Sequence, residues 1–158
     1  MLDRDQSSIR FRENMASLVL WRTLLLPGKP ICAPPGPEYT PVTLTLEPLV
    51  GGPAWMPLHA AIEHNGFRYD FLPTYPESSE TAANLLTGQT VDGVVRCRNL
   101  LIRHEGVDSP KQRFLLGYSA KTSVELQGFA EKQPRALQLL RNDCWTFGAA
   151  VAGFAIGC

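Results

Sequence analysis

The sequence predicts an α+β fold in which an antiparallel sheet packs against a helix that carries a cysteine. Two observations lead to this prediction. An Asn-Gly pair joins two alternating segments in the manner of a β-hairpin, and a run of small and apolar residues begins at Cys144. Other strand-like and helix-like segments lie around the hairpin, and several antiparallel strands with a few helices are typical of the α+β class.

The composition is that of a globular protein with one main domain. The chain has 158 residues, of which 44% are hydrophobic, and this is enough to bury a core. Fifteen basic residues balance fifteen acidic ones, so we expect no nucleic-acid partner, which would favour an excess of positive charge. No apolar segment reaches the roughly 20 residues that a transmembrane helix needs.

The cysteines favour a reducing compartment. They stand at positions 32, 97, 144 and 158 and form no Cys-x-x-Cys pair. We therefore expect free thiols and a cytoplasmic protein. Residues 16–29 contain Ser, Thr, Arg and Lys but no acidic residue, which resembles an organelle transit segment and makes a plastid or a mitochondrion the alternative location.

Residues 1–41 are predicted to be a lead-in followed by a connector. The first 17 residues are polar, residues 18–26 are apolar, and residues 27–41 are rich in proline and favour an extended chain. The domain is predicted to span residues 42–158. Its first strand is Val42–Leu46, in which apolar residues alternate with threonine.

The clearest local signal is the hairpin at Asn65-Gly66. A type I′ turn needs positive φ at both central residues, and Asn-Gly provides it. A two-residue loop fixes the register, so the predicted pairing starts at His64 opposite Phe67 and continues to His59 opposite Leu72. One face is then a core face. The other face carries His59 and Asp70 as diagonal neighbours, within reach of one another.

The remaining elements are predicted from caps, turns and alternation. The predicted elements are a helix from Ser78 or Ser79 to Leu86 with Gly88 as its stop, a strand within Val91–Ile102, a polar loop over Arg103–Pro110, a strand over Arg113–Tyr118, a helix over Ser123–Lys132 and a strand over Ala136–Leu140 that leads to the cysteine helix.

Cys144 is the candidate nucleophile. Asn142 and Asp143 precede it, and both residue types are favoured helix N-caps. Cys144 would then lie in the first turn, where unpaired N–H groups and the helix dipole favour negative charge. These conditions lower a thiol pKa.

A nucleophilic cysteine also needs a base and a group that orients the base. His104 lies in a charged loop and is expected to be solvated, and His64 falls on the apolar face and is expected to be packed in the core. His59 remains, with Asp70 beside it. The predicted site is therefore Cys144, His59 and Asp70.

Each of these residues also has a structural interpretation. A cysteine in an apolar helix is often an inert core residue, and Asp70 could simply pair with Arg68. No metal site is predicted, because His59 and His64 point to opposite faces of one strand. No cofactor is predicted either, because the sequence has no glycine-rich phosphate loop ending in Lys-Ser or Lys-Thr.

The segment Cys144-Trp145-Thr146-Phe147-Gly148-Ala149-Ala150-Val151 resembles the nucleophile helix of papain-like thiol proteases. In those enzymes the histidine follows the cysteine, whereas here all three histidines precede it. The order His59, Asp70, Cys144 is instead similar to circularly permuted papain-like proteins. These include the lecithin:retinol acyltransferase-like and NlpC/P60-related group and the PPPDE-type deubiquitinating peptidases.

The resemblance rests on two segments. Residues 58–73 resemble the strand–turn–strand hairpin of the acyltransferase-like members, with Asp70 where those enzymes often carry histidine. Asn142-Asp143-Cys144 resembles their Asn-Cys helix start, with one extra residue.

The resemblance implies a permuted papain-like domain that acts as a thiol hydrolase or acyltransferase. Cys144 would attack an acyl carbon, His59 would carry the proton and Asp70 would hold the histidine tautomer. The substrate would be a peptide or other amide, an isopeptide or an acyl ester. The alternative is a non-catalytic binding or scaffold protein of the same fold, because a fold does not establish a function.

Overall fold

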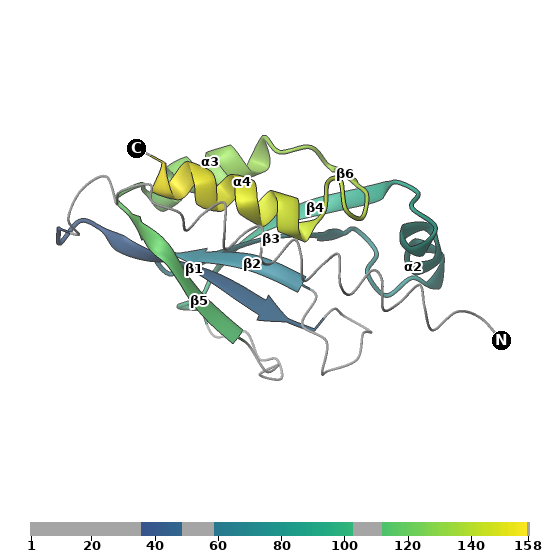
Figure 1. The fold of residues 1–158 in the computed structure, drawn as a ribbon, viewed down its shortest axis with the longest axis horizontal. Coiled ribbons are helices and arrows are strands. Elements are labelled where there is room, and N and C mark those ends of the chain that lie inside the picture. The colour runs from purple at the N-terminus through teal and green to yellow at the C-terminus, as the bar shows by residue number, and fades with distance from the viewer. Residues whose placement is uncertain (1–35, 49–58, 103–111, 158) are drawn as a thin grey trace.

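Six strands form one antiparallel sheet in the part of the chain that the structure describes (Figure 1). The structure is a computed structural model, and it describes residues 36–48, 59–102 and 112–157. The strand order is β5-β1-β2-β3-β4-β6. The strands are β1 (Thr40–Glu47), β2 (His59–His64), β3 (Phe67–Pro73), β4 (Val91–Asn99), β5 (Gln112–Ser119) and β6 (Ala136–Leu137). Together with the described helices α2 (Ser79–Leu86), α3 (Ser123–Glu131) and α4 (Cys144–Ile156), they confirm the predicted α+β class.

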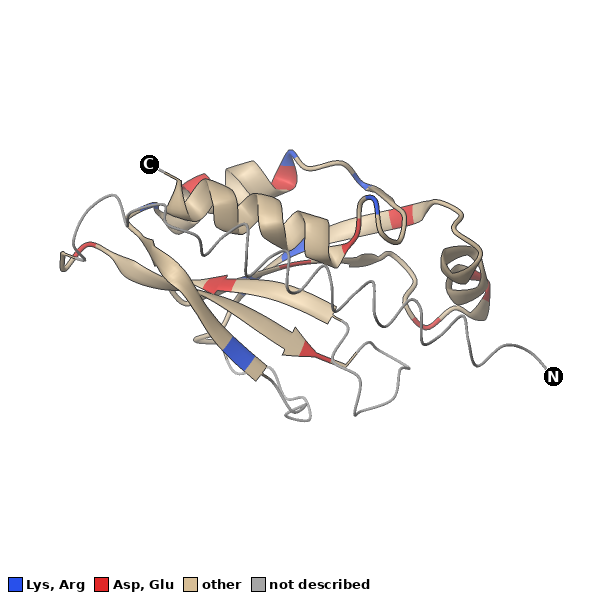
Figure 2. Cartoon of the chain, in the orientation of Figure 1, with Lys and Arg blue, Asp and Glu red and all other residues tan. Residues whose placement is uncertain are grey.

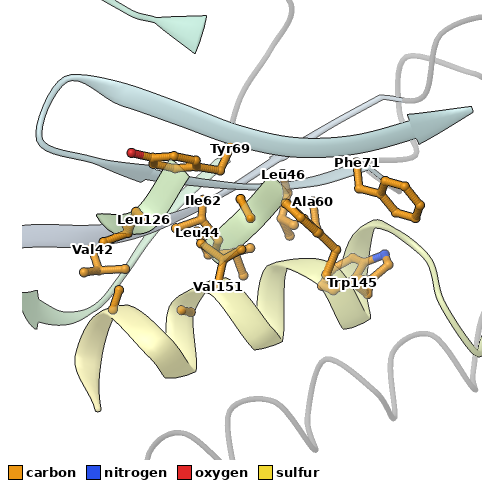
Figure 3. Close-up of a cluster of buried hydrophobic side chains, with 14 of the residues drawn as sticks. Val42, Leu44, Leu46, Ala60, Ile62, Tyr69, Phe71, Leu126, Trp145 and Val151 are labelled. Carbon is orange, nitrogen blue, oxygen red and sulfur yellow. The ribbon is translucent and has the colours of Figure 1, made fainter. Parts of the chain in front are cut away.

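The core lies between the sheet and α4, which runs across one face of the sheet beside α3 (Figure 1). Figure 3 shows the apolar side chains of the central strands directed toward α4. Because side chains alternate along a strand, these strands turn their other face away from the helices. The helix itself contains no charged residue (Figure 2). The core residues include Val42, Leu44, Leu46, Ala60, Ile62, Tyr69, Phe71, Leu126, Trp145, Phe147 and Val151.

The Asn-Gly hairpin is confirmed. Asn65 and Gly66 have φ angles of 48° and 77°, as a type I′ turn requires. The predicted register holds for four pairs, His64 with Phe67, Glu63 with Arg68, Ile62 with Tyr69 and Ala61 with Asp70.

The predicted pairing beyond Ala61 and Asp70 is wrong, because the sheet opens there between β2 and β3. β2 remains paired with β1 as far as His59, and β3 remains paired with β4 as far as Pro73. β2 therefore stays paired with β1 and β3 with β4, while the pairing between β2 and β3 ends. On the β3 side of this opening, the ring of Phe71 packs against Phe147 of α4, with 5.7 Å between ring centroids.

The predicted helices are confirmed, with small differences at their ends. Ser78 is the N-cap of α2, and Gly88 follows this helix with a φ of 79°. Thr122 caps α3 and forms a capping box with Glu125. Asp143 is the N-cap of α4, in agreement with the prediction for Asn142-Asp143.

The predicted strand over Ala136–Leu140 is wrong beyond Leu137. Gln138 and Asn142 instead form a turn, in which the Asn142 N–H donates to the Gln138 carbonyl over 2.9 Å. Leu140 adopts a left-handed conformation with a φ of 67°, which is uncommon for a residue other than glycine. Its N–H donates to Asp143 Oδ2 over 2.9 Å, so the cap of α4 also holds the turn that leads into it.

The predicted strand boundaries shift elsewhere by a few residues. β1 begins at Thr40, two residues before the predicted domain boundary, and β4 ends at Asn99 rather than at Ile102. The predicted lead-in and most of the connector lie outside the described residues. The polar loop that contains His104 also lies outside them, and so does Leu58, which precedes β2. Among the helices described, none has the length and apolar character needed to cross a membrane.

Candidate active site

His59 and Asp70 meet on the polar face of the sheet, at the opening between β2 and β3. His59 Nε2 lies 3.4 Å from Asp70 Oδ2, and both side chains are buried. The other ring nitrogen of His59, Nδ1, is buried and has no hydrogen-bond partner among the residues that the structure describes. The contact with Asp70 thus sets the orientation of the imidazole and leaves Nδ1 available for a second group.

Three arginines surround the carboxylate of Asp70. Arg96 donates to it twice, from Nε over 3.0 Å and from a terminal nitrogen over 2.9 Å, and Arg98 donates once over 3.1 Å. The Nε of Arg68 lies 3.5 Å away. Burial alone would raise the pKa of Asp70, but hydrogen bonds from His59 and Arg96 and the charge of Arg96 outweigh it and hold this pKa well below its usual range. Asp70 is therefore ionised at neutral pH.

The ion pairs of the described residues all belong to one network centred on Asp70. Arg68 bonds to Glu47 and also lies 3.9 Å from Glu63, whose other oxygen is 3.3 Å from Arg113. Glu63 and Arg68, which face one another across the hairpin, thus belong to the same network. Figure 2 shows acidic positions on β1 and β2 and a basic position on β5, opposite a helix without charge. The polar face of the sheet therefore carries an ordered charge network in which Asp70 and Arg68 are buried.

Cys144 is the first residue of α4, the helix that packs against β2 and β3, and it reaches the backbone of Ala60. In a hairpin with a two-residue loop, the closing pair is hydrogen-bonded and the pattern alternates along the ladder. Ala60 would therefore bond to Phe71 if the ladder continued. The ladder stops at Ala61, and the backbone of Ala60 hydrogen-bonds to the thiol instead. The sulfur is thereby placed at the opening, next to the residue that follows His59.

The expected lowering of the Cys144 pKa is wrong in direction. Burial, together with the charges of Asp143 and Asp70, raises the pKa of this thiol to about 12, against smaller lowering effects of the Ala60 and Cys144 backbone amides. Burial of the sulfur is the main cause of the raised pKa, and the cap adds to it. Asp143 Oδ1 already accepts hydrogen bonds from the N–H groups of Trp145 and Thr146, each over 3.0 Å. The residue that caps the helix thus occupies its first-turn amides and places a negative charge beside the sulfur.

We accordingly expect Cys144 to be alkylated slowly at neutral pH and increasingly fast as the pH rises. Because its pKa lies above that of an ordinary thiol, its thiolate fraction is smaller at every pH below about 12. The measurement is the rate of iodoacetamide modification at Cys144, followed by peptide mass spectrometry, with glutathione as the reference thiol. The alkylation rate of glutathione should reach its plateau at a lower pH than the rate of Cys144. A Cys144 rate that levels off before that of glutathione would contradict the expected direction.

Glu47, His59 and Asp70 bring three potential metal-ligating atoms within 4.8 Å of one another. These residues do not fit a cation, however. Asp70 accepts hydrogen bonds from Arg96 and Arg98, and Glu47 accepts one from Arg68, so a metal ion would be placed beside guanidinium groups. The donor chemistry of the site is better suited to proton transfer than to metal binding.

The structure brings His59 and Asp70 into contact and places Cys144 against the strand residue next to His59. His64 is a packed histidine, as expected, because its ring nitrogens face the carbonyl oxygens of Pro41 and Lys121. The sequence analysis missed Glu47, Arg96 and Arg98. The alternation Arg96-x-Arg98 within a predicted strand was a usable signal, since it places both arginines on one face.

Comparisons of the chain with protein-family models, with curated proteins and with solved structures find no match.

Proposed function

We propose that the protein is a cysteine-dependent hydrolase or acyltransferase, with Cys144 as nucleophile, His59 as base and Asp70 as the group that orients the base. The observation that carries this proposal is the state of His59. Its Nε2 contacts a buried carboxylate, its Nδ1 is buried and has no hydrogen-bond partner in the described part of the chain, and the backbone of the next residue bonds to the Cys144 thiol. A base that a carboxylate orients, with a second ring nitrogen to accept a proton, is what nucleophilic catalysis needs, and the backbone that bonds to the thiol is one residue away along β2.

The proposed fold is a permuted papain-like domain. Its support is the combination of a hairpin that bears His59 and Asp70 with a later helix that starts at Cys144 and packs on the same sheet. The order of the three residues along the chain is compatible with this proposal, because such sites are defined by their geometry and roles.

The reaction would start from a protonated thiol, because the pKa of Cys144 is raised. As the sulfur of Cys144 bonds to the acyl carbon of an amide, an isopeptide or an ester, its proton moves to His59 Nδ1. Asp70 holds the ring and stabilises the imidazolium that forms. The backbone N–H of Cys144, which lies against its own sulfur, is placed to donate to the oxyanion.

The second half of the reaction returns the protein to its starting state. His59 gives its proton to the leaving nitrogen or oxygen, which leaves a thioester on Cys144. Water or another acceptor then attacks the thioester, His59 takes the proton of the attacking group, and the sulfur is released and reprotonated. A high thiol pKa is compatible with this scheme, because the proton is removed during the attack and not beforehand.

The test is the acylation of Cys144 by p-nitrophenyl acetate, detected as an acetylated Cys144 peptide by mass spectrometry. We expect His59→Gln to slow this acylation by about 100-fold or more, as loss of a general base does. His64→Gln is the matched control, since His64 is a buried histidine on the opposite face of the same strand. Its acylation rate should remain within about twofold of the wild type once circular dichroism shows that it is folded.

Two results would contradict the proposal. One is the absence of an acetylated Cys144 peptide in the wild type, and the other is an equal loss of rate in the two histidine variants. Either result would favour the second candidate function, a non-catalytic binding or scaffold protein. The observation that favours this alternative is the raised pKa of Cys144, because a neutral, partly buried thiol packed against the core is also typical of a structural residue.

A further inference from the structure

Arg96 and Arg98 of β4 share a single carboxylate. They stand two residues apart and therefore on the same face of the strand. Both donate to Asp70, and among the described residues neither forms an ion pair with another acidic group. Two guanidinium groups and one carboxylate leave a local excess of one positive charge at this position.

The neighbouring strand does not remove this excess. Arg98 lies directly opposite Arg68, and like charges at directly opposed positions destabilise a sheet. Arg68 pairs with Glu47 and Glu63, and Glu63 also pairs with Arg113, so the two positive and two negative charges of these residues balance one another. The positive charge without a counterpart is therefore that of the Arg96–Arg98 pair.

The pair is open to solvent on one side. The side chains of Arg96 and Arg98 are 38% and 37% exposed, whereas that of Arg68 is 2% exposed. Arg98 bonds to Asp70 through a terminal nitrogen, and its Nε is buried and has no hydrogen-bond partner within the described ranges. A guanidinium with available N–H groups in a planar fork is the preferred protein partner of carboxylates and phosphates.

We propose that Arg96 and Arg98 form a binding site for an oxyanion, a carboxylate or a phosphate group carried by the acyl substrate of Cys144. This proposal rests on the proposed function, because it places the anionic group of the substrate beside the His59–Asp70 pair. An anion there neutralises the excess charge of the two partly exposed guanidinium groups. The substrate class is thereby narrowed from any acyl compound to an acyl compound with a negative group near the bond that is cleaved.

The first test is a titration of the full chain with inorganic phosphate and, separately, with acetate, at constant ionic strength maintained with sodium chloride. The readout is the ¹H–¹⁵N NMR signal of the Arg96 and Arg98 Nε–H groups. We expect saturable shifts of both signals, and the two anions show whether the pair prefers phosphate or carboxylate. Shifts that grow linearly with both anions and do not saturate would overturn the proposal.

Two variants decide whether the binding belongs to this pair. Arg98→Gln leaves both Arg96 bonds to Asp70 in place, and we expect it to weaken phosphate binding about tenfold or more at the Arg96 signal, because a charged hydrogen-bond donor is lost. Arg113→Gln is the matched control, since Arg113 is an exposed arginine of the same network that bonds to Glu63 and not to Asp70. Equal weakening in both variants would show general attraction of anions to the surface and would overturn the proposal.

The second test links the pair to the thiol. Iodoacetate and iodoacetamide both alkylate a thiolate, forming an S–C bond and releasing iodide, but only iodoacetate carries a carboxylate. We expect the iodoacetate-to-iodoacetamide rate ratio at Cys144 to exceed that of glutathione about tenfold, and phosphate or Arg98→Gln to abolish this excess. A ratio equal to that of glutathione would overturn the link to the substrate.

The failure of this inference can be distinguished from failure of the proposed function. Phosphate binding does not require the thiol, so Cys144→Ala should bind phosphate as the wild type does. If phosphate binds and Cys144 is not acylated by p-nitrophenyl acetate, the proposed function fails while the anion site stands. If Cys144 is acylated and phosphate does not bind, the anion site fails alone.

Discussion

Replacement of Asp70 by alanine is expected to lower the free energy of unfolding by about 3–5 kcal/mol, the range for removal of one partner from a buried ion pair. Asp70 is fully buried and contacts three arginines and His59. Its removal would leave the buried Arg68 with fewer partners and Arg96 and Arg98 with no acidic partner among the described residues. Urea denaturation followed by circular dichroism measures the change.

Arg113→Gln is the control for the Asp70 prediction, because it belongs to the same network but has an exposed side chain. We expect it to change stability by no more than about 1 kcal/mol, as for an exposed ion pair. If Asp70→Ala were no more destabilising than Arg113→Gln, the described network would not contribute to stability in solution.

The same carboxylate makes stability depend on pH in the acid range. The pKa of Asp70 is lowered in the folded state, so its contribution is fully present above the unfolded value of about 3.9 and is lost as the pH falls further through the lowered value. The wild type should therefore lose more stability than Asp70→Ala when the pH is lowered below about 4. Equal losses would place the acid sensitivity at other carboxylates.

Replacement of Gly93 by alanine is expected to destabilise the protein by about 1–3 kcal/mol, as overpacking of a filled core does. A Cβ atom at Gly93 would overlap the ring of Phe71 and would lie 2.9 Å from the backbone oxygen of Arg135. The backbone oxygen cannot move freely, because it accepts a 2.8 Å hydrogen bond from the Gly93 N–H. The ring of Phe71 would have to leave its contact with Phe147.

Gly153→Ala is the matched control, because a Cβ at this exposed position of α4 meets no atom within 4 Å. Alanine is a better helix former than glycine, so this variant should be more stable than the wild type by about 0.5–1 kcal/mol. Urea denaturation measures the change in the free energy of unfolding for both variants. A Gly93→Ala variant as stable as the wild type would show that Phe71 has room to repack at the opening of the sheet.

The sequence contained enough information to predict the hairpin and the meeting of His59 with Asp70. Asn65-Gly66 imposes one turn geometry, and a two-residue turn imposes one register. The register between β3 and β4 was not predictable in this way, because these strands are connected through α2 and not through a tight turn. The placement of Arg96 opposite Asp70, and therefore the charge of the site, follows only from the structure.

The thiol pKa illustrates a different limit. Asp143 was recognised as a helix cap from its residue type, and the structure confirms it. A capping aspartate, however, both satisfies the first-turn amides and adds a full negative charge. The pKa of the neighbouring thiol then depends on how deeply the sulfur is buried, and this depth cannot be predicted from the sequence pattern alone.

The position of α4 in the chain has a consequence for how the protein is made. This helix provides much of the apolar layer that covers the sheet, and it follows all the described strands in the chain. During synthesis on the ribosome, the strands emerge first, and their apolar face has no α4 to bury it until residues 144–156 have left the exit tunnel. The nascent chain therefore passes through a stage with exposed hydrophobic surface, in which association with chaperones competes with aggregation.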